Sequence, residues 1–94
     1  VRIKAKIWKI EEWFVIDTGF SGEVMTNYEV FNEIPFPTFD AGDICVTESE
    51  CYKALDKMST LNVLGIETEV TVLWAPVFDA NLIGERALIK LGLV

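Results

Sequence analysis

Phe-Val-Ile-Asp-Thr-Gly-Phe-Ser-Gly, residues 14–22, is the stretch on which the interpretation of the whole sequence depends. The apolar run Trp13–Ile16 predicts a buried strand that ends at Asp17. A carboxylate at the end of such a strand is poorly solvated, so its neutral form is favoured. Gly19 lets the backbone turn and come close to another chain or ligand, and the Thr18 hydroxyl can hold the loop to a neighbour.

A second apolar segment, Ala80–Gly84, lies near the C-terminus and contains Leu82, Ile83 and Gly84. Asp, Thr and Gly are turn-forming residues, so an isolated Asp-Thr-Gly would be interpreted as a surface turn. The preceding apolar strand and the later segment favour a functional loop instead. Together the two motifs resemble those of the retropepsin-like aspartic proteases, and Asp-Thr-Gly-Phe resembles the version in small archaeal and bacterial members.

The resemblance implies an all-β fold, a small retropepsin-like acid-protease barrel that spans residues 1–94 as a single domain and has one short C-terminal helix. It implies that Asp17 is the catalytic carboxylate, that Thr18 and Gly19 support its loop, and that Leu82-Ile83-Gly84 packs behind the site. The chain has a single Asp-Thr-Gly, whereas the chemistry needs two carboxylates. A homodimer that cleaves a peptide or protein substrate is therefore expected, without a metal or another cofactor.

The composition of the chain argues against several classes of partner and of catalytic site. The net charge is −7, and a nucleic-acid partner is not expected because phosphate neutralisation needs Lys and Arg. The absence of His excludes Ser-His-Asp and Cys-His catalysis and the usual zinc sites. Hydrophobic residues make up 51% of this small chain, which favours a second subunit covering part of the apolar surface. No stretch is long and apolar enough to span a membrane, and we expect a cytoplasmic protein.

A hairpin is predicted between the strands Ile44–Val46 and Cys51–Leu55. In the family, a β-hairpin flap closes over the substrate at about this point, so the candidate flap tip is Thr47-Glu48-Ser49-Glu50. Retroviral flap tips are glycine-rich and this one has no glycine, so an ordinary solvated turn is the alternative. Cys45 and Cys51 flank the tip without metal-type spacing. They can pair if the register allows, but reduced thiols are the expected state in a cytoplasm.

The rest of the chain predicts short elements. Asn27 can cap a short helix that runs through Glu33, near residues 27–34. Phe36 and Phe39 are expected in the core, with a pocket wall as the alternative. The other predictions are a half-buried strand Val1–Ile7 with a basic, solvated outer face, a turn at Asp40–Gly42, a strand pair Met58–Leu64 and Glu67–Trp74 around Gly65, and a helix Glu85–Leu91 that ends at Gly92.

One supporting feature of the family is missing. The family pattern often has an Arg directly after the Gly of the second motif and an Asp two positions beyond the Gly of the first. Here Glu85 and Ser21 stand at these positions, and Arg86 is the candidate replacement. The expected function is peptide hydrolysis. The alternatives are a catalytically silent dimeric domain of the same fold that binds peptides or assembles a larger protein, and an unrelated small β-barrel binding module.

Overall fold

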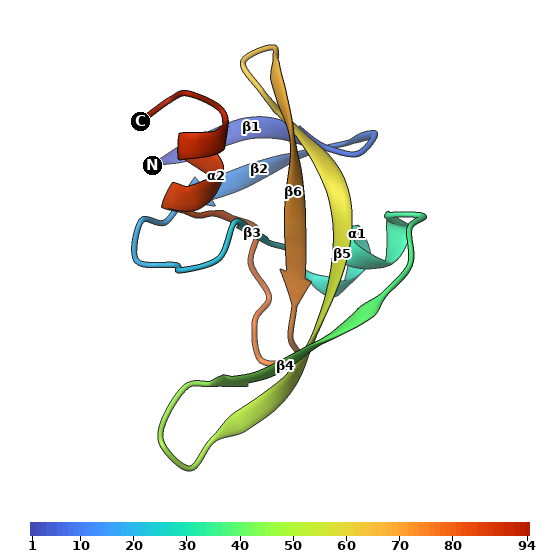
Figure 1. The fold of residues 1–94 in the computed structure, drawn as a ribbon, viewed down its shortest axis with the longest axis vertical. Helices are drawn as coiled ribbons and strands as arrows, with labels where there is room; N and C mark the ends of the chain where they lie inside the picture. The colour runs from blue at the N-terminus through green and yellow to red at the C-terminus, as the bar shows by residue number, and fades with distance from the viewer.

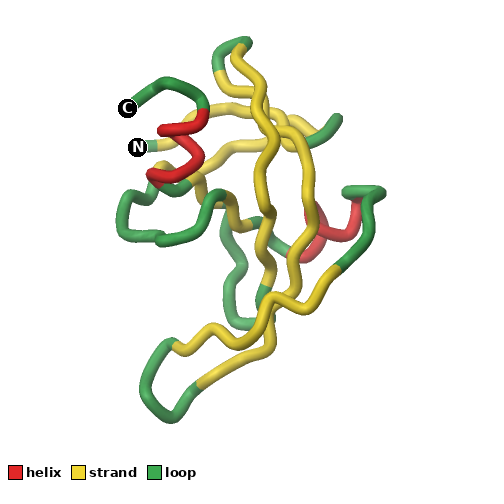
Figure 2. The backbone as a smooth tube through the Cα atoms, viewed as in Figure 1, coloured by secondary structure: helices red, strands yellow, loops and turns green.

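Strand pairing closes the chain into one seven-stranded sheet in the computed structural model, which describes residues 1–94. The strand order is β1-β2-β7-β3-β6-β5-β4, and an additional pairing of β1 with β5 turns the sheet back on itself. Two short helices lie on opposite sides of β5 and β6 in the view of Figures 1 and 2. The elements are β1 Arg2–Ile7, β2 Ile10–Ile16, β3 Val24–Met25, α1 Tyr28–Glu33, β4 Phe39–Cys45, β5 Cys51–Val63, β6 Ile66–Trp74, β7 Leu82–Ile83 and α2 Glu85–Lys90.

The N-terminal hairpin is half-buried along both of its strands. In β2 only Phe14 is fully buried, whereas Trp13 is 48% exposed and Val15 is also exposed, so the prediction of a buried strand Trp13–Ile16 is wrong. Side chains alternate between the two faces of a strand, and the outer face of this hairpin meets solvent. The cations of Arg2 and Lys4 cover the Trp13 ring at 5.1 and 5.4 Å from its centroid, which shields this aromatic side chain on the outer face.

The central strand β5 is longer than the sequence suggested. The predicted strands Cys51–Leu55 and Met58–Leu64 are parts of one 13-residue strand. It continues through Lys57, whose buried ammonium donates to the carbonyl oxygens of Phe31 at 2.7 Å and Ile34 at 2.8 Å. Burial lowers the pKa of Lys57. The lysine thus links the end of α1 to β5 by donating to two carbonyl oxygens at the C-terminal end of the helix.

The segment Asp40–Gly42 lies within β4 and does not form the predicted separate turn. The register of β4 against β5 shifts between Asp40 and Asp43, which marks a β-bulge. Gly42 has a positive φ of 83°, and its N–H donates to Asp40 Oδ1 at 2.8 Å. Glycine accommodates this conformation without a Cβ clash. The turn signal in the sequence therefore corresponds to an irregularity inside a strand.

The core lies inside the closed sheet and under α1. Asn27 caps this helix by accepting the Val30 N–H at 2.9 Å, as predicted. Phe36 and Phe39 are not core residues, being 37% and 56% exposed. They line a surface hollow beside Met58, so the pocket-wall alternative holds. The largest fully buried side chains are Phe14, Ile7, Ile34, Leu61, Ile83, Val24, Val63, Val70 and Val72, together with Thr26.

The C-terminal helix α2 packs as the sequence predicts. Ala87 and Leu91 are buried, and Leu88 packs against the core. Gly92 has a φ of 74° and donates to Ile89 O at 3.0 Å, which ends the helix in a Schellman-type arrangement. Neither helix is long and apolar enough to cross a membrane.

Candidate active site

Two segments from opposite ends of the chain position Asp17. Strand β7 lies between β2 and β3, parallel to β2 and antiparallel to β3. Its residues Leu82 and Ile83 pair with Val15 and Ile16 of β2. The Asp17 N–H continues this pairing by donating to Ile83 O at 2.9 Å. Asp17 therefore leaves the sheet at the first position after β2, with its backbone still fixed.

The loop after β2 folds back on the Asp17 carboxylate. Asp17 is half-buried. Its Oδ1 accepts the Gly19 N–H at 3.0 Å, and its carbonyl oxygen accepts the Phe20 N–H at 3.2 Å. Thr18 is exposed, and its hydroxyl makes no hydrogen bond within the chain. A brace through Thr18 therefore requires a second chain.

Gly84 supports this loop from behind. Its N–H donates to Glu23 O at 2.8 Å. A Cβ at this position would overlap Gly22 O and would lie 2.9 Å from Phe20 O. Only a residue without a side chain fits so close to the loop backbone. The structure thus brings the Leu82-Ile83-Gly84 segment against the Asp17 loop.

A hollow of about 470 Å³ opens beside Asp17. Its wall is largely apolar, and Asp17 is its one ionisable side chain. Gly19 and Leu82 were expected near the site, and Ile44 was expected in a strand of the candidate flap hairpin. Phe78 was not expected at the site, because its position depends on long-range pairing. The lining residues are Asp17, Gly19, Phe20, Ser21, Gly22, Met25, Ile44, Leu73, Phe78 and Leu82. An apolar surface with one carboxylate suits a ligand that presents apolar groups.

The hairpin of β4 and β5 projects from the body of the protein as a two-stranded arm (Figure 1). Its tip residues Thr47, Glu48, Ser49 and Glu50 are exposed, and the structure does not bring them to the hollow. Tyr52 O–H donates to Glu50 Oε2 at 2.7 Å, a hydrogen bond that, with a smaller effect of burial, raises the pKa of Tyr52. The arm reaches the hollow through Ile44 instead.

Cys45 and Cys51 form a disulfide across this arm, so the expectation of two reduced thiols is wrong. The two residues are direct cross-strand partners, which brings their side chains together on one face of the hairpin. The register that pairs them is set by the turn between the two strands, and the sequence left it open.

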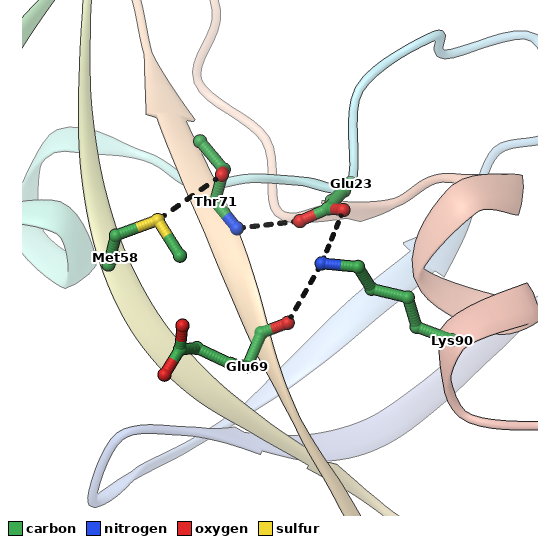
Figure 3. Close-up of polar contacts among 5 residues, drawn as sticks. All are labelled: Glu23, Met58, Glu69, Thr71 and Lys90. Atoms are coloured by element: carbon green, nitrogen blue, oxygen red, sulfur yellow. Dashed lines mark hydrogen bonds and ion pairs between the residues drawn. The ribbon is translucent and has the colours of Figure 1, made fainter.

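Glu23 is a residue of the site that the sequence did not indicate. Its Oε1 accepts the Thr71 N–H at 2.7 Å, and its Oε2 pairs with Lys90 Nζ at 2.8 Å (Figure 3). Lys90 also donates to the carbonyl oxygen of Glu69 at 3.2 Å. Glu23 thus joins the end of the Asp17 loop to β6 and α2.

The same contacts determine the charge state of Glu23. Burial alone would raise its pKa. The hydrogen bonds from Lys90 and the Thr71 amide outweigh burial, with help from the charges of Lys90 and Arg86, and hold the pKa of Glu23 below its usual value. Arg86 makes no ion pair of its own. Arg86 and Lys90 are four residues apart in one helix. This spacing in the sequence indicates that both cations lie on the same face of that helix.

Asp17 is the one carboxylate that lines the hollow. No group of three or more His, Cys, Asp or Glu side chains is arranged to hold a metal ion. The chemistry that one chain brings to the hollow is therefore that of a single carboxylate.

No protein-family model matches the sequence, and no curated protein matches it. Among solved structures, EIAV protease in complex with the inhibitor HBY-793 is similar to this chain with a TM-score of 0.82. The fold is retropepsin-like. The match covers 100% of this chain and 89% of that chain at 14% sequence identity, so the likeness establishes the retropepsin-like fold alone. The expected all-β fold is confirmed, and the likeness to archaeal and bacterial members stays a prediction.

Proposed function

We propose that the protein is an aspartic endopeptidase that acts as a homodimer. The observation that carries the proposal is the position of Asp17, half-buried at an apolar hollow in a retropepsin-like fold. Each chain contains one Asp-Thr-Gly, so one chain contributes one carboxylate. A two-fold axis beside the Asp17 loops would supply the second.

In the proposed dimer, the two Asp17 carboxylates share one proton. Like charges a few ångströms apart do not both ionise readily, so the pair holds a single proton over a wide pH range. The ionised carboxylate takes a proton from a water molecule, which attacks the scissile carbonyl carbon. The protonated carboxylate donates to the carbonyl oxygen. The Gly19 N–H, which donates to Asp17 Oδ1, fixes the orientation of each carboxylate.

The substrate in this proposal is an extended peptide. The apolar lining of the hollow, including Phe20, Leu73 and Phe78, would receive apolar side chains next to the scissile bond. The arm formed by β4 and β5 would cover the peptide as a flap, with Ile44 as its contact to the hollow. The exposed glutamates of the tip, Glu48 and Glu50, would face the approaching substrate rather than the scissile bond.

The test is cleavage of an unfolded polypeptide by the purified protein over a series of acidic to neutral pH values. Asp17→Asn should abolish cleavage while the folded state and the dimer persist. Glu33→Gln is the matched control, since it also neutralises one carboxylate, at an exposed position at the end of α1 away from the hollow. Equal activity of the Asp17→Asn variant and the unsubstituted protein would contradict the proposal.

A catalytically silent domain of the same fold gives a different result in the same experiment. Such a protein would bind an unfolded polypeptide both before and after the Asp17→Asn substitution, and neither form would cleave it. Binding without cleavage at any pH therefore supports the dimeric peptide-binding or assembly domain over the endopeptidase.

A further inference from the structure

The arm that reaches the hollow carries the only sulfur–sulfur bond of the protein. Cys45 and Cys51 form the last strand pair before the tip, and both residues are exposed. The tip is otherwise held by three hydrogen bonds, from Val46 N–H to Glu50 O at 2.9 Å, from Glu50 N–H to Thr47 O at 3.4 Å and from Tyr52 O–H to Glu50 Oε2 at 2.7 Å. The disulfide is therefore the only covalent constraint on this end of the arm.

The bond lies directly beside the residue that connects the arm to the site. Ile44 precedes Cys45, pairs with Tyr52 and lines the hollow that contains Asp17. On the other side, the bulge at Gly42 interrupts the pairing of β4 with β5. Ile44 thus lies in a short paired segment between a bulge and a disulfide. Loss of the disulfide would leave that segment without a covalent constraint.

We propose that the Cys45–Cys51 disulfide is a thiol-responsive switch that controls how firmly the arm covers the hollow. This inference rests on the proposed endopeptidase function and adds a regulation of the same site. With the bond intact, Ile44 is held in register and completes the wall against the substrate. With the bond reduced, the arm remains paired through Asp43↔Lys53 but its end frays, and the substrate is held less firmly.

The chemical step is thiol–disulfide exchange with a dithiol. A thiolate of the dithiol attacks one bridge sulfur and forms a mixed disulfide, while the other cysteine leaves as a thiolate and takes up a proton. The second thiol of the reductant then displaces the remaining cysteine. The protein gains two electrons and two protons, and the dithiol becomes a cyclic disulfide.

Two features favour a switch over a structural staple. Exposure of both cysteines gives a dithiol access to the bond. The bond also closes a short loop, with a sequence separation of 6, and a disulfide across a short loop constrains the unfolded chain less than one across a long loop. The core contains neither cysteine, so reduction is expected to loosen the arm and leave the rest of the fold in place.

The experiment compares oxidised protein with protein reduced by dithiothreitol, and measures kcat and KM on a peptide together with hydrogen exchange of backbone amides. Reduction should raise KM by roughly three- to ten-fold with kcat changed by less than about two-fold, because the change affects coverage of the substrate and not the Asp17 carboxylates. Exchange should speed up at Ile44 and Val46 and stay unchanged in β6. Reoxidation should restore both values.

The matched variant is Cys45→Ser combined with Cys51→Ser. It should behave like the reduced protein, and dithiothreitol should change neither its KM nor its exchange rates. Unchanged KM and unchanged exchange on reduction would overturn the switch, and so would a lowered KM. If neither redox form cleaves any peptide, that result contradicts the endopeptidase proposal but not the switch, which is then tested by hydrogen exchange alone. Faster exchange confined to the arm on reduction would still support the switch in that case, and its absence would overturn it.

Discussion

Glu23 Oε2 lies 2.8 Å from Lys90 Nζ, and this ion pair connects the end of the Asp17 loop to the last turn of α2. The Glu23 side chain is only 12% exposed, whereas that of Lys90 is 43% exposed. A partly buried pair of this kind is less screened by solvent than a surface pair. It gives this chain a link between loop and helix although Glu85 and Ser21 stand where the family pattern often has Arg and Asp.

Neutralising Glu23 should weaken the fold modestly. Glu23→Gln keeps an oxygen for the Thr71 N–H but removes the charge that Lys90 contacts. We expect a loss of about 1 kcal/mol in the free energy of unfolding, measured by urea denaturation. The control is Glu11→Gln, which breaks the exposed pair of Lys4 and Glu11 and should change stability by less than about 0.5 kcal/mol. Equal effects of the two variants would contradict a special role for Glu23.

The contribution of Glu23 should disappear in acid. Because the folded-state pKa of Glu23 is lowered, its stabilisation is fully present above the pKa of the unfolded chain, about 4.3, and is lost as the pH falls through the folded-state pKa. The stability difference between the unsubstituted protein and Glu23→Gln should therefore be largest near pH 7 and shrink below pH values of about 4. Urea denaturation at several pH values measures it, and a constant difference would contradict the assignment.

Thr18 should act in the proposed homodimer and not within one chain. Its hydroxyl is exposed and makes no hydrogen bond inside the chain. Thr18→Ala is expected to raise the dissociation constant of the dimer by roughly thirty-fold, the effect of losing two hydrogen bonds of about 1 kcal/mol each, one per subunit. Thr18→Ser should be mild because it keeps the hydroxyl. Analytical ultracentrifugation gives the dissociation constant, and activity should fall on dilution in parallel.

The two tip glutamates should influence which peptides are captured. Glu48 and Glu50 are exposed on a protein with a net charge of −7, and their field concentrates cationic peptides and repels anionic ones. Combining Glu48→Gln with Glu50→Gln should lower the ratio of cleavage rates for matched cationic and anionic peptides at low salt. Added salt should shrink the difference.

The control for this charge effect removes two exposed glutamates elsewhere. Glu29→Gln combined with Glu33→Gln changes the net charge equally on α1, away from the arm. If this variant alters the ratio as much as the tip variant does, the preference comes from net charge and not from the position of the tip.

Gly84 should be intolerant of any side chain. Gly84→Ala places a Cβ against the backbone oxygens of Gly22 and Phe20, and we expect a loss of about 2 kcal/mol in unfolding free energy together with impaired activity. Gly92→Ala is the comparison, since its Cβ meets nothing within 4 Å and only the positive φ opposes it, at about 1 kcal/mol. Thermal and urea denaturation measure both, and a smaller effect at Gly84 would contradict the proposed packing.

The structural features that were predicted correctly depend mostly on short stretches of neighbouring residues. The Asn27 cap, the Gly92 stop and the Leu64-Gly65 turn each depend on a few neighbouring residues, and all three occur in the structure. Asp17 and the Leu82-Ile83-Gly84 segment were found through paired motifs. Their hydrogen bond from Asp17 N–H to Ile83 O supports that interpretation of the two segments.

Features that depend on distant residues were missed. The sequence predicted two separate strands on either side of Lys57. In the structure the Lys57 ammonium donates to the carbonyl oxygens of Phe31 and Ile34, and one strand continues through this residue. The contact of Glu23 with Lys90 and the pairing of Cys45 with Cys51 depend on tertiary packing and on strand register. No local pattern in the sequence reports either of them.

The parallel pairing of β2 with β7 has a consequence for the order of folding. The hairpin of β5 and β6 joins neighbouring residues and can form early, whereas Val15 and Leu82 come from opposite ends of the chain. Contacts of such long sequence separation require closure of a large loop and form slowly. We therefore expect Asp17 to be fixed only after the C-terminal segment has been synthesised and has docked. If the proposed endopeptidase function holds, a nascent chain would remain unable to cleave its neighbours until it has been synthesised through Gly84.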